Sequence, residues 1–314
     1  MIIIHWLRLL RWQNLLLLAL AQFLFFRCIV KPALQMNYAD TELPYWALAL
    51  LILASLSVAA AGYVTNDIHN TTEDDINRPG KNQVGKAISE QHAHNFYLIA
   101  NFTGIGISIF LAYYVRHLQL CCLFIIAAIA LSLYSTWLKK KMIVGHLIIA
   151  LLSCFSMWVV FAYEPAFWNV ARTLGAVAAA GIIMGVYSFL FFVNTLLREI
   201  IKSAEDEEGD RIAGVKSIAT QFGNTAVRVA SAVLVVISFV VVAYIGWYFM
   251  QKKWWLLTSY IFVLLCLPHL LTLYMLLFRQ AVKKTYRSLS LLLKLEMFFA
   301  VLSMLIFFIE IFYA

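Results

Sequence analysis

Nine long runs of apolar residues set the strongest constraint on how this 314-residue chain can fold. A helix needs about 20 apolar residues to cross the hydrocarbon core of a bilayer, and inside lipid only a helix or a closed barrel satisfies its own backbone. The runs lack the alternation of apolar and polar residues that is typical of barrel strands. We therefore expect an all-α, polytopic membrane helical bundle of about nine transmembrane helices, near residues 15–31, 45–65, 94–115, 118–137, 143–162, 172–196, 224–249, 255–278 and 290–312. Only "RHLQ" separates the third and fourth spans, which predicts a tight hairpin.

The composition and the positions of the basic residues agree with a membrane protein. The chain is 63% hydrophobic and 13% charged, whereas soluble domains are about 45–50% apolar and roughly 25% charged. Of the 24 Lys and Arg, 18 fall on the side of the predicted membrane that carries the N-terminus. By the positive-inside rule we expect an integral protein of a bacterial inner membrane, with the N-terminus cytoplasmic and the C-terminus outside. The net charge of +8 reflects this asymmetry, so we expect no nucleic-acid partner.

The acidic residues gather in two of the predicted cytoplasmic loops. Ten of the 16 Asp and Glu lie in "NDIHNTTEDDINRPGK", after the second span, and in "REIIKSAEDEEGDRIAGVKS", after the sixth. If the second span continued as a helix, Asn66, Asn70 and Asp74 would share one face at i, i+4 and i+8. The second loop repeats this spacing with Lys202, Asp206 and Asp210.

Stacked carboxylates destabilise an isolated helix, and a divalent cation reverses that effect. Carboxylate and amide oxygens suit Mg²⁺, which substrate phosphates often complete. Neighbouring Lys and Arg suit the remaining oxygens of a diphosphate, and an apolar bundle suits a hydrocarbon tail. These features together predict an enzyme that handles an isoprenoid diphosphate at the membrane, with cytoplasmic catalytic loops after helices 2 and 6.

The chain's cysteines and histidines do not indicate a zinc site. All five Cys fall in or beside apolar spans and form no CxxC pair, which favours plain packing. His69, His92 and His94 lie near the first acidic loop, away from any cysteine. A zinc enzyme is therefore disfavoured, because zinc sites need clustered ligands at short fixed spacings.

The two loops resemble the aspartate-rich motifs of the UbiA-type intramembrane prenyltransferases. The first loop is similar to N-D-x-x-D-x-x-x-D running on into "NRP", and the second is similar to a motif with a D-x-x-x-D pair. The R-E-I-x-K and E-D-x-E-G-D segments of the second loop most resemble those of family members that act on geranylgeranylglyceryl phosphate. "LRLLRWQN", with Asn14, and "LYSTWLK", with Tyr134 and Lys139, are further matches. The resemblance extends over the whole chain, so we expect a single domain, 1–314.

The resemblance implies Mg²⁺-dependent transfer of an isoprenoid chain from a polyprenyl diphosphate to a small or lipid acceptor among the membrane lipids. No obligate protein partner is indicated. The implied metal ligands are Asn66, Asp67, Asn70, Asp74, Asp206 and Asp210. The implied diphosphate-binding residues are Arg78, Lys81, Lys139, Arg198 and Lys202. Lys139 and Lys202 are also catalytic candidates, together with Tyr134 facing the allylic cation; Asn14 and Asn66 are substrate-binding candidates.

Two positions depart from the family's pattern. Asn70 stands where the first motif has its second Asp, and Ser203 stands where the most similar members have a further Asp. Each change removes a negative charge, so weaker metal binding is expected. A catalytically silent relative that only binds an isoprenoid diphosphate remains an alternative.

From the sequence, one alternative stands for the acceptor and another for the broad functional class of the protein. The motif form favours a glycerol-phosphate-type lipid precursor over an aromatic quinone precursor. A membrane transporter, from a different class, would place charges near the middle of the bilayer, whereas Glu296 is the clearest acid inside a span here. We interpret the basic segments "WLKKK" and "RQAVKKTYR" as membrane-surface anchors.

Overall fold

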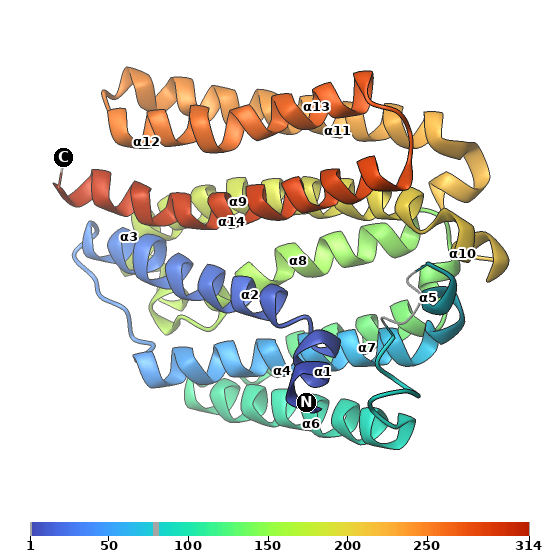
Figure 1. The fold of residues 1–314 in the computed structure, drawn as a ribbon. Coiled ribbons are helices and arrows are strands. Elements are labelled where there is room, and N and C mark those ends of the chain that lie inside the picture. The colour runs from blue at the N-terminus through green and yellow to red at the C-terminus, as the bar shows by residue number, and fades with distance from the viewer. Residues whose placement is uncertain (1, 78–81, 314) are drawn as a thin grey trace.

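The computed structural model describes residues 2–77 and 82–313, with side chains except those of 72–74, 170–173 and 312–313. Within this part of the chain, nine helical spans are long and apolar enough to cross a membrane. The spans lie side by side in a bundle, with their ends gathered at two opposite faces (Figure 1). The predicted all-α polytopic fold and its number of spans are confirmed.

The helices follow the predicted runs closely. The α-helices are α1 (Ile2–Leu9), α2 (Trp12–Phe25), α3 (Lys31–Gln35), α4 (Tyr45–His69), α5 (Thr71–Asn77), α6 (Glu90–Tyr114), α7 (Cys121–Thr136), α8 (Val144–Ala162), α9 (Val170–Glu205), α10 (Glu207–Ile212), α11 (Ile218–Gln251), α12 (Trp255–Tyr260), α13 (Leu267–Phe278) and α14 (Lys283–Tyr313). Short 3₁₀ turns lie at η2 (Leu118–Leu120), η3 (Leu138–Lys140) and η4 (Pro165–Trp168). α6 and α7 form the predicted tight hairpin, which turns through η2.

Two spans contain a π-helical segment directly before a proline-bearing turn. The first span continues from α2 through η1 (Phe26–Val30) into α3, which has Pro32 in its first turn. The eighth continues from α12 through η5 (Ile261–Cys266) into α13, with Pro268 in the same position. Because proline lacks an N–H and its ring crowds the preceding turn, the helix widens there and still crosses the membrane.

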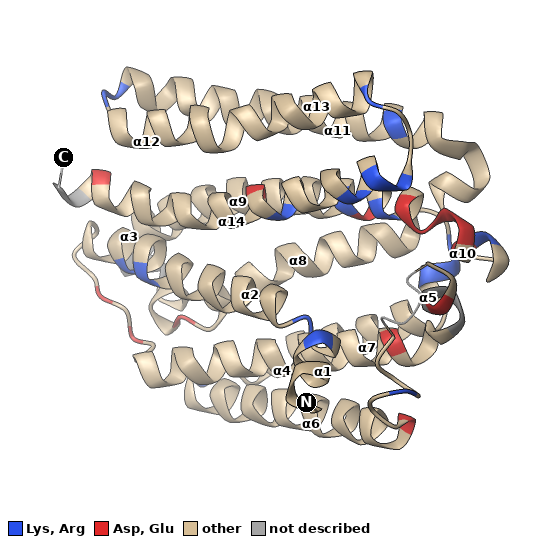
Figure 2. Ribbon diagram, in the orientation of Figure 1, with Lys and Arg blue, Asp and Glu red and all other residues tan. Residues whose placement is uncertain are grey.

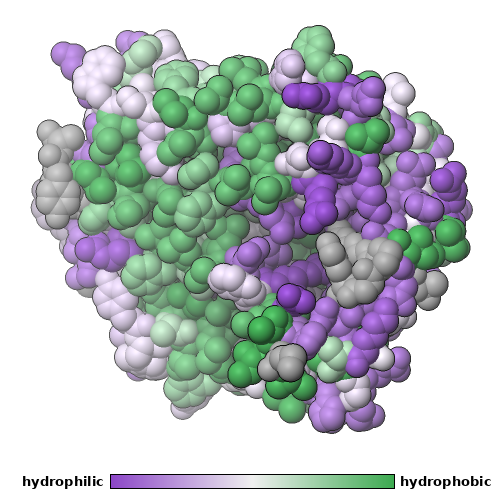
Figure 3. All heavy atoms as spheres, viewed as in Figure 1, coloured by the Kyte–Doolittle hydropathy of each residue, from purple (hydrophilic) through white to green (hydrophobic). Residues whose placement is uncertain are grey.

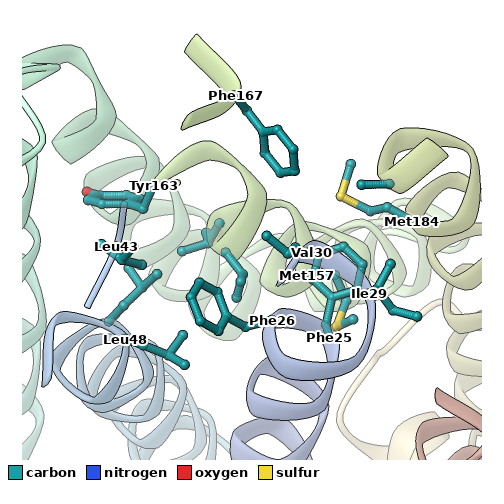
Figure 4. Packing of buried hydrophobic residues seen from close by; sticks show 14 of the residues in the cluster. Phe25, Phe26, Ile29, Val30, Leu43, Leu48, Met157, Tyr163, Phe167 and Met184 are labelled. Carbon is teal, nitrogen blue, oxygen red and sulfur yellow. The ribbon is translucent and has the colours of Figure 1, made fainter. Parts of the chain in front are cut away.

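The largest buried cluster packs the first span against its neighbours in the bundle. Phe25, Phe26 and Ile29 of the first span pack with Met157 of α8 and Met184 of α9 (Figure 4). All five side chains are almost completely buried. Helix association in lipid depends on such close packing, because the lipid tails are as apolar as the side chains.

Charged residues lie mostly at one end of the bundle. Lys, Arg, Asp and Glu concentrate around α5, α10 and the adjoining ends of α9 and α14 (Figure 2). In the space-filling view, hydrophilic residues gather at this end and hydrophobic residues cover most of the middle of the visible face (Figure 3). This distribution is expected when the apolar band faces lipid.

At the other end, Glu164 fixes the connection that leads into α4. Its Oε1 accepts hydrogen bonds from the backbone N–H of Glu42 (2.8 Å) and of Ala166 (3.1 Å), and its Oε2 accepts one from Leu43 (3.3 Å). Burial raises the pKa of Glu164, and the three N–H groups oppose that rise. The three hydrogen bonds of this acid therefore have a structural role, because they hold two connections together at this end of the bundle.

Glu296, the acid inside a span, is paired in the interior. Its Oε1 lies 3.0 Å from Nε2 of His269, and both side chains are buried. The same His269 nitrogen lies 2.8 Å from Oγ of Ser238. The contact joins α11, α13 and α14, as expected for an ionisable residue within a membrane.

A glycine sets the close approach of α4 and α6. A Cβ built on Gly104 would lie 2.7 Å from a methyl of Val58 and 2.9 Å from the backbone oxygen of Ala54, whereas one on Gly106 would meet nothing within 4 Å. We predict that Gly104→Ala forces the helices apart and costs about 1–3 kcal/mol of stability. Thermal unfolding in detergent should show a lower Tm for Gly104→Ala and little change for Gly106→Ala; equal values would contradict this packing.

Candidate active site

The first acidic loop begins with a helix break. α4 ends at His69, Asn70 has non-helical φ/ψ of −109° and 17°, and α5 then begins at Thr71. The expected continuous i, i+4, i+8 face is therefore wrong for Asn66, Asn70 and Asp74. Asn is a poor residue for a helix interior, and the Asn70 side chain here bonds to the distant Lys139.

The second acidic loop has the same construction. α9 ends at Glu205, Asp206 has φ/ψ of −101° and 9°, and α10 begins at Glu207. The expected single face through Lys202, Asp206 and Asp210 is thus also interrupted. In both loops, a long membrane helix stops at an Asn or Asp and a short helix folds over the bundle end.

The two short helices pack against each other and join motifs that are distant in sequence. Oδ1 of Asn77, the last residue of α5, accepts a hydrogen bond of 2.9 Å from the backbone N–H of Gly209 in α10. There is no room for a side chain at Gly209, because a Cβ would lie 2.5 Å from the Asn77 amide nitrogen. Lys283 of α14 donates to the backbone oxygen of Asn77 at 2.9 Å, so three elements meet there.

A polar cavity of about 1130 Å³, here called the polar chamber, lies between these elements and the helix ends. It brings together every sequence-predicted site residue whose side chain is described. These residues are Asn14, Asn66, Asp67, Asn70, Tyr134, Lys139, Arg198, Lys202, Asp206 and Asp210. The side chain of Asp74, and Arg78 and Lys81 altogether, lie outside the described residues.

A second, mainly apolar cavity of about 280 Å³ lies next to the polar chamber. Side chains such as Leu17, Val58, Phe124 and Phe191 line it. The two cavities share a ring of residues, so the polar chamber opens toward an apolar space. This shared ring consists of Arg11, Asn14, Asn66, Tyr134, Arg198, Glu199, Lys202 and Lys294.

Arg11 forms a specific contact with the first motif at this ring. Its guanidinium donates to Oδ1 of Asp67 at 2.8 Å and lies 5.0 Å from the ring centroid of Tyr63. Asn14 donates to the Tyr63 hydroxyl at 3.4 Å. Arg11 has a φ of 51°, an uncommon conformation for a residue with a side chain, so its position between α1 and α2 is strained. Sequence reasoning had noted its segment without assigning Arg11 a role.

The two departures from the family's pattern have partners inside the protein. The Lys139 ammonium donates to Oδ1 of buried Asn70 at 2.6 Å. The buried Ser203 hydroxyl donates to the backbone oxygen of Ile200 at 2.7 Å. Asp75, although in the first motif, pairs with Lys86 at 2.5 Å and does not line the polar chamber.

The donor set of the polar chamber fits a cation that is shared with a phosphate ligand. Among the described side chains, no three of His, Cys, Asp and Glu stand close enough to hold a metal by themselves. Mg²⁺, however, is often held by one or two carboxylates together with water and substrate phosphates. Asp67, Asp206 and Asp210 line the same cavity from two motifs, and Asp210 is buried. These residues therefore suit Mg²⁺ bound jointly with a diphosphate.

The polar chamber also contains cations that the sequence interpretation assigned elsewhere. "RQAVKKTYR" was expected to anchor the membrane surface, but Lys283, Lys284 and Arg287 from this segment line the polar chamber, as do Arg8 of α1 and Lys294 of α14. The helical spacing of Lys283, Arg287 and Lys294 along one side of α14 is the signal that could have indicated this.

The bundle and its site define an integral-membrane α-helical protein with a charged interfacial chamber above an apolar cavity. The model of the UbiA prenyltransferase family matches residues 33–302. The chain belongs to this family.

Curated relatives agree with this assignment. The chain is 33% identical to digeranylgeranylglyceryl phosphate synthase of Sulfurisphaera tokodaii over 203 residues, 63% of this chain and 66% of the relative. It is also 33% identical to the enzyme of the same name from Korarchaeum cryptofilum over 182 residues, 55% of this chain and 56% of the relative. The matched region thus spans just under two thirds of the first relative and somewhat more than half of the second.

Solved structures share the fold at lower identity. A digeranylgeranylglyceryl phosphate synthase structure aligns with a TM-score of 0.63 and 21% identity, covering 98% of this chain and 99% of the other. A UbiA homolog from Archaeoglobus fulgidus bound to GPP and Mg²⁺ aligns with a TM-score of 0.57 and 14% identity, covering 96% and 99%. Both alignments extend over nearly the whole bundle.

The Asn77–Gly209 contact predicts a sensitive position at the chamber. Gly209→Ala would push α10 away from α5, because its Cβ collides with the Asn77 amide. We expect faster protease cleavage of residues 205–215 with little change in the Tm of the membrane bundle. Adding Asn77→Ala should relieve the collision and partly restore protection, whereas Gly185→Ala, with open space around it, serves as the control. Unchanged cleavage of the Gly209→Ala variant would contradict the proposed junction.

Proposed function

We propose that this protein transfers an isoprenoid chain from a polyprenyl diphosphate to a membrane-associated acceptor in a Mg²⁺-dependent reaction. The observation that carries the proposal is the shared ring between the polar chamber and the apolar cavity. An allylic diphosphate has the same two parts, a strongly anionic head and a hydrocarbon tail. Its reacting carbon lies where they meet, which is the place of the ring.

The carboxylates and amides of the two motifs are the proposed metal-holding residues. Asp67, Asp206 and Asp210, with Asn66 beside them, would hold Mg²⁺ against the diphosphate oxygens, and Asp74 belongs to the same proposed set. Bound Mg²⁺ would neutralise part of the charge on the leaving diphosphate. The solved Archaeoglobus fulgidus homologs with Mg²⁺ and GPP or DMAPP support this assignment.

The cations of the shared ring have a separate role in the proposal. Arg198 and Lys202 lie on α9 beside the second motif and line both cavities, and Lys139 reaches the polar chamber from the end of the fourth span. Fixed cations that face the leaving diphosphate stabilise the charge that develops there as the allylic bond breaks. Arg78 and Lys81 are further candidates for the same diphosphate.

Tyr134 and Asn14 are proposed to act on the organic part of the substrate. Both belong to the shared ring. The face of an aromatic ring attracts a cation, so Tyr134 would stabilise the allylic cation beside the apolar cavity. Asn14 donates a hydrogen bond to the Tyr63 hydroxyl, and it would position the prenyl diphosphate near its first carbon. The apolar lining of the second cavity would exclude water from the hydrocarbon tail.

The acceptor that we propose is a glycerol-phosphate-type lipid precursor. The curated relatives are named digeranylgeranylglyceryl phosphate synthases, and the second motif has the corresponding form. The polar chamber also holds more cations than a single diphosphate site requires, including those of α14. An aromatic quinone precursor is the alternative that an acceptor panel would reveal.

We also propose the domain and its orientation. Residues 1–314 would form one domain with the polar chamber on the cytoplasmic side, the N-terminus cytoplasmic and the C-terminus outside. The excess of Lys and Arg at the chamber end supports this orientation. A bacterial inner membrane stays part of this proposal, and the relatives named above come from archaea.

The proposed reaction predicts a strong dependence on the second motif. Purified protein in nanodiscs, supplied with geranylgeranyl diphosphate and an acceptor panel, should release pyrophosphate only with Mg²⁺ and form a prenylated product. Asp206→Asn should lower the rate about 100-fold or more, because it removes a charged ligand of the proposed Mg²⁺, which would neutralise the leaving diphosphate. Asp75→Asn, an exposed change outside the polar chamber, is the control and should retain most activity. Diphosphate binding without turnover on any acceptor would instead favour a silent relative.

The departure at residue 70 generates a second prediction. Asn70→Asp restores a negative charge beside Lys139 and should lower the Mg²⁺ concentration for half-maximal activity several-fold. A Mg²⁺ titration of wild type and variant at saturating diphosphate checks this. An unchanged or higher Mg²⁺ requirement would show that residue 70 does not contribute to the metal site.

A further inference from the structure

The first part of α14 presents a row of basic residues with no acid among them. The row, here called the α14 basic row, consists of Lys283, Lys284, Arg287 and Lys294. Lys283, Arg287 and Lys294 are spaced i, i+4 and i+11, which places them within roughly 40° of one another around the helix and along about 16 Å of its length. Lys284 borders the same side. The first acid of α14 is Glu296, which is already paired with His269.

The α14 basic row faces the site. All four residues line the polar chamber, and Lys294 also lines the apolar cavity. Arg279, a cation of the connection before α14, is exposed like Lys283, Lys284 and Arg287 but lines neither cavity. The row therefore differs from Arg279 in bordering the polar chamber, where a bound anion would lie.

The row differs in its chemistry from the cations beside the two motifs. Arg198 and Lys202 share α9 with Glu199 and Glu205, which also line the polar chamber. Lys284 and Arg287 form no salt bridge with a described residue, and Lys283 donates to a backbone oxygen. Clustered Lys and Arg side chains suit a phosphate group, which they bind through charge-assisted hydrogen bonds.

We propose that the α14 basic row binds the phosphate monoester of the acceptor lipid, in a subsite separate from the one that binds the donor diphosphate. This inference rests on the proposed function and specifies which residues select a phosphorylated acceptor. A phosphate on Arg287 would leave the glycerol end of the lipid directed along the row toward Lys294 and the shared ring.

The test compares geranylgeranylglyceryl phosphate with its dephosphorylated counterpart, geranylgeranylglycerol. We expect wild type to prefer the phosphate, and Arg287→Gln/Lys284→Gln to raise the KM for the phosphorylated acceptor about tenfold or more with little change in the KM for geranylgeranyl diphosphate. Lys283 is left intact because it also holds α5. Arg287→Lys should recover part of the affinity, and Arg279→Gln, the matched loss of charge outside the polar chamber, should behave as wild type.

A second experiment separates this inference from the proposed function. It measures binding of each of the two lipids to the protein in nanodiscs by tryptophan fluorescence, with no prenyl diphosphate present. Binding that requires the lipid phosphate and is lost in Arg287→Gln/Lys284→Gln supports the subsite, even if wild type fails to transfer a prenyl group to that lipid. Transfer by wild type with the phosphate preference retained in the double variant would overturn the subsite and leave the proposed function standing. A rise in the KM for the donor instead of the acceptor would assign the row to the diphosphate and also overturn the inference.

Discussion

The cost of placing charge in hydrocarbon governs this structure. A membrane helix forms all of its backbone hydrogen bonds internally, so its backbone is stable in lipid. Charged side chains have no such solution, and they are stable only at the bundle ends, in a polar chamber or in a buried pair. Glu296 with His269 is such a pair, and Glu164 is fixed by backbone N–H groups at the bundle end away from α5 and α10. The remaining acids concentrate at the other end, where α5 and α10 fold over the bundle and turn a charged surface into the polar chamber.

The sequence predicted the bundle and brought together ten residues that line the polar chamber, because both depend on composition and order. Runs of apolar residues define spans almost regardless of packing, and the two acidic loops follow spans that end on the same side. The breaks at Asn70 and Asp206 were not predicted, since the i, i+4, i+8 spacing is compatible with a continuing helix and does not show where the backbone leaves it. The position of the α14 basic row beside the polar chamber was not predicted, because the sequence of a charged segment does not reveal which way a helix face points.

Asn70 and Ser203, the two departures from the family's pattern, each form a hydrogen bond inside the protein. Asn70 accepts a hydrogen bond from Lys139, and Ser203 bonds to its own helix, so neither oxygen is left unpartnered. A carboxylate at either position would add negative charge to the polar chamber. The chain instead combines fewer acids with many cations, which favours anionic substrates over tight binding of free metal.

The central claim is that the two motifs form one diphosphate site that needs Mg²⁺. The most direct measurement is calorimetric binding of geranylgeranyl diphosphate to the purified protein in nanodiscs, with and without Mg²⁺. We predict saturable binding of one diphosphate per chain that is strongly weakened when Mg²⁺ is removed. Equal affinity with and without Mg²⁺ would contradict the claim and assign diphosphate recognition to the cations alone.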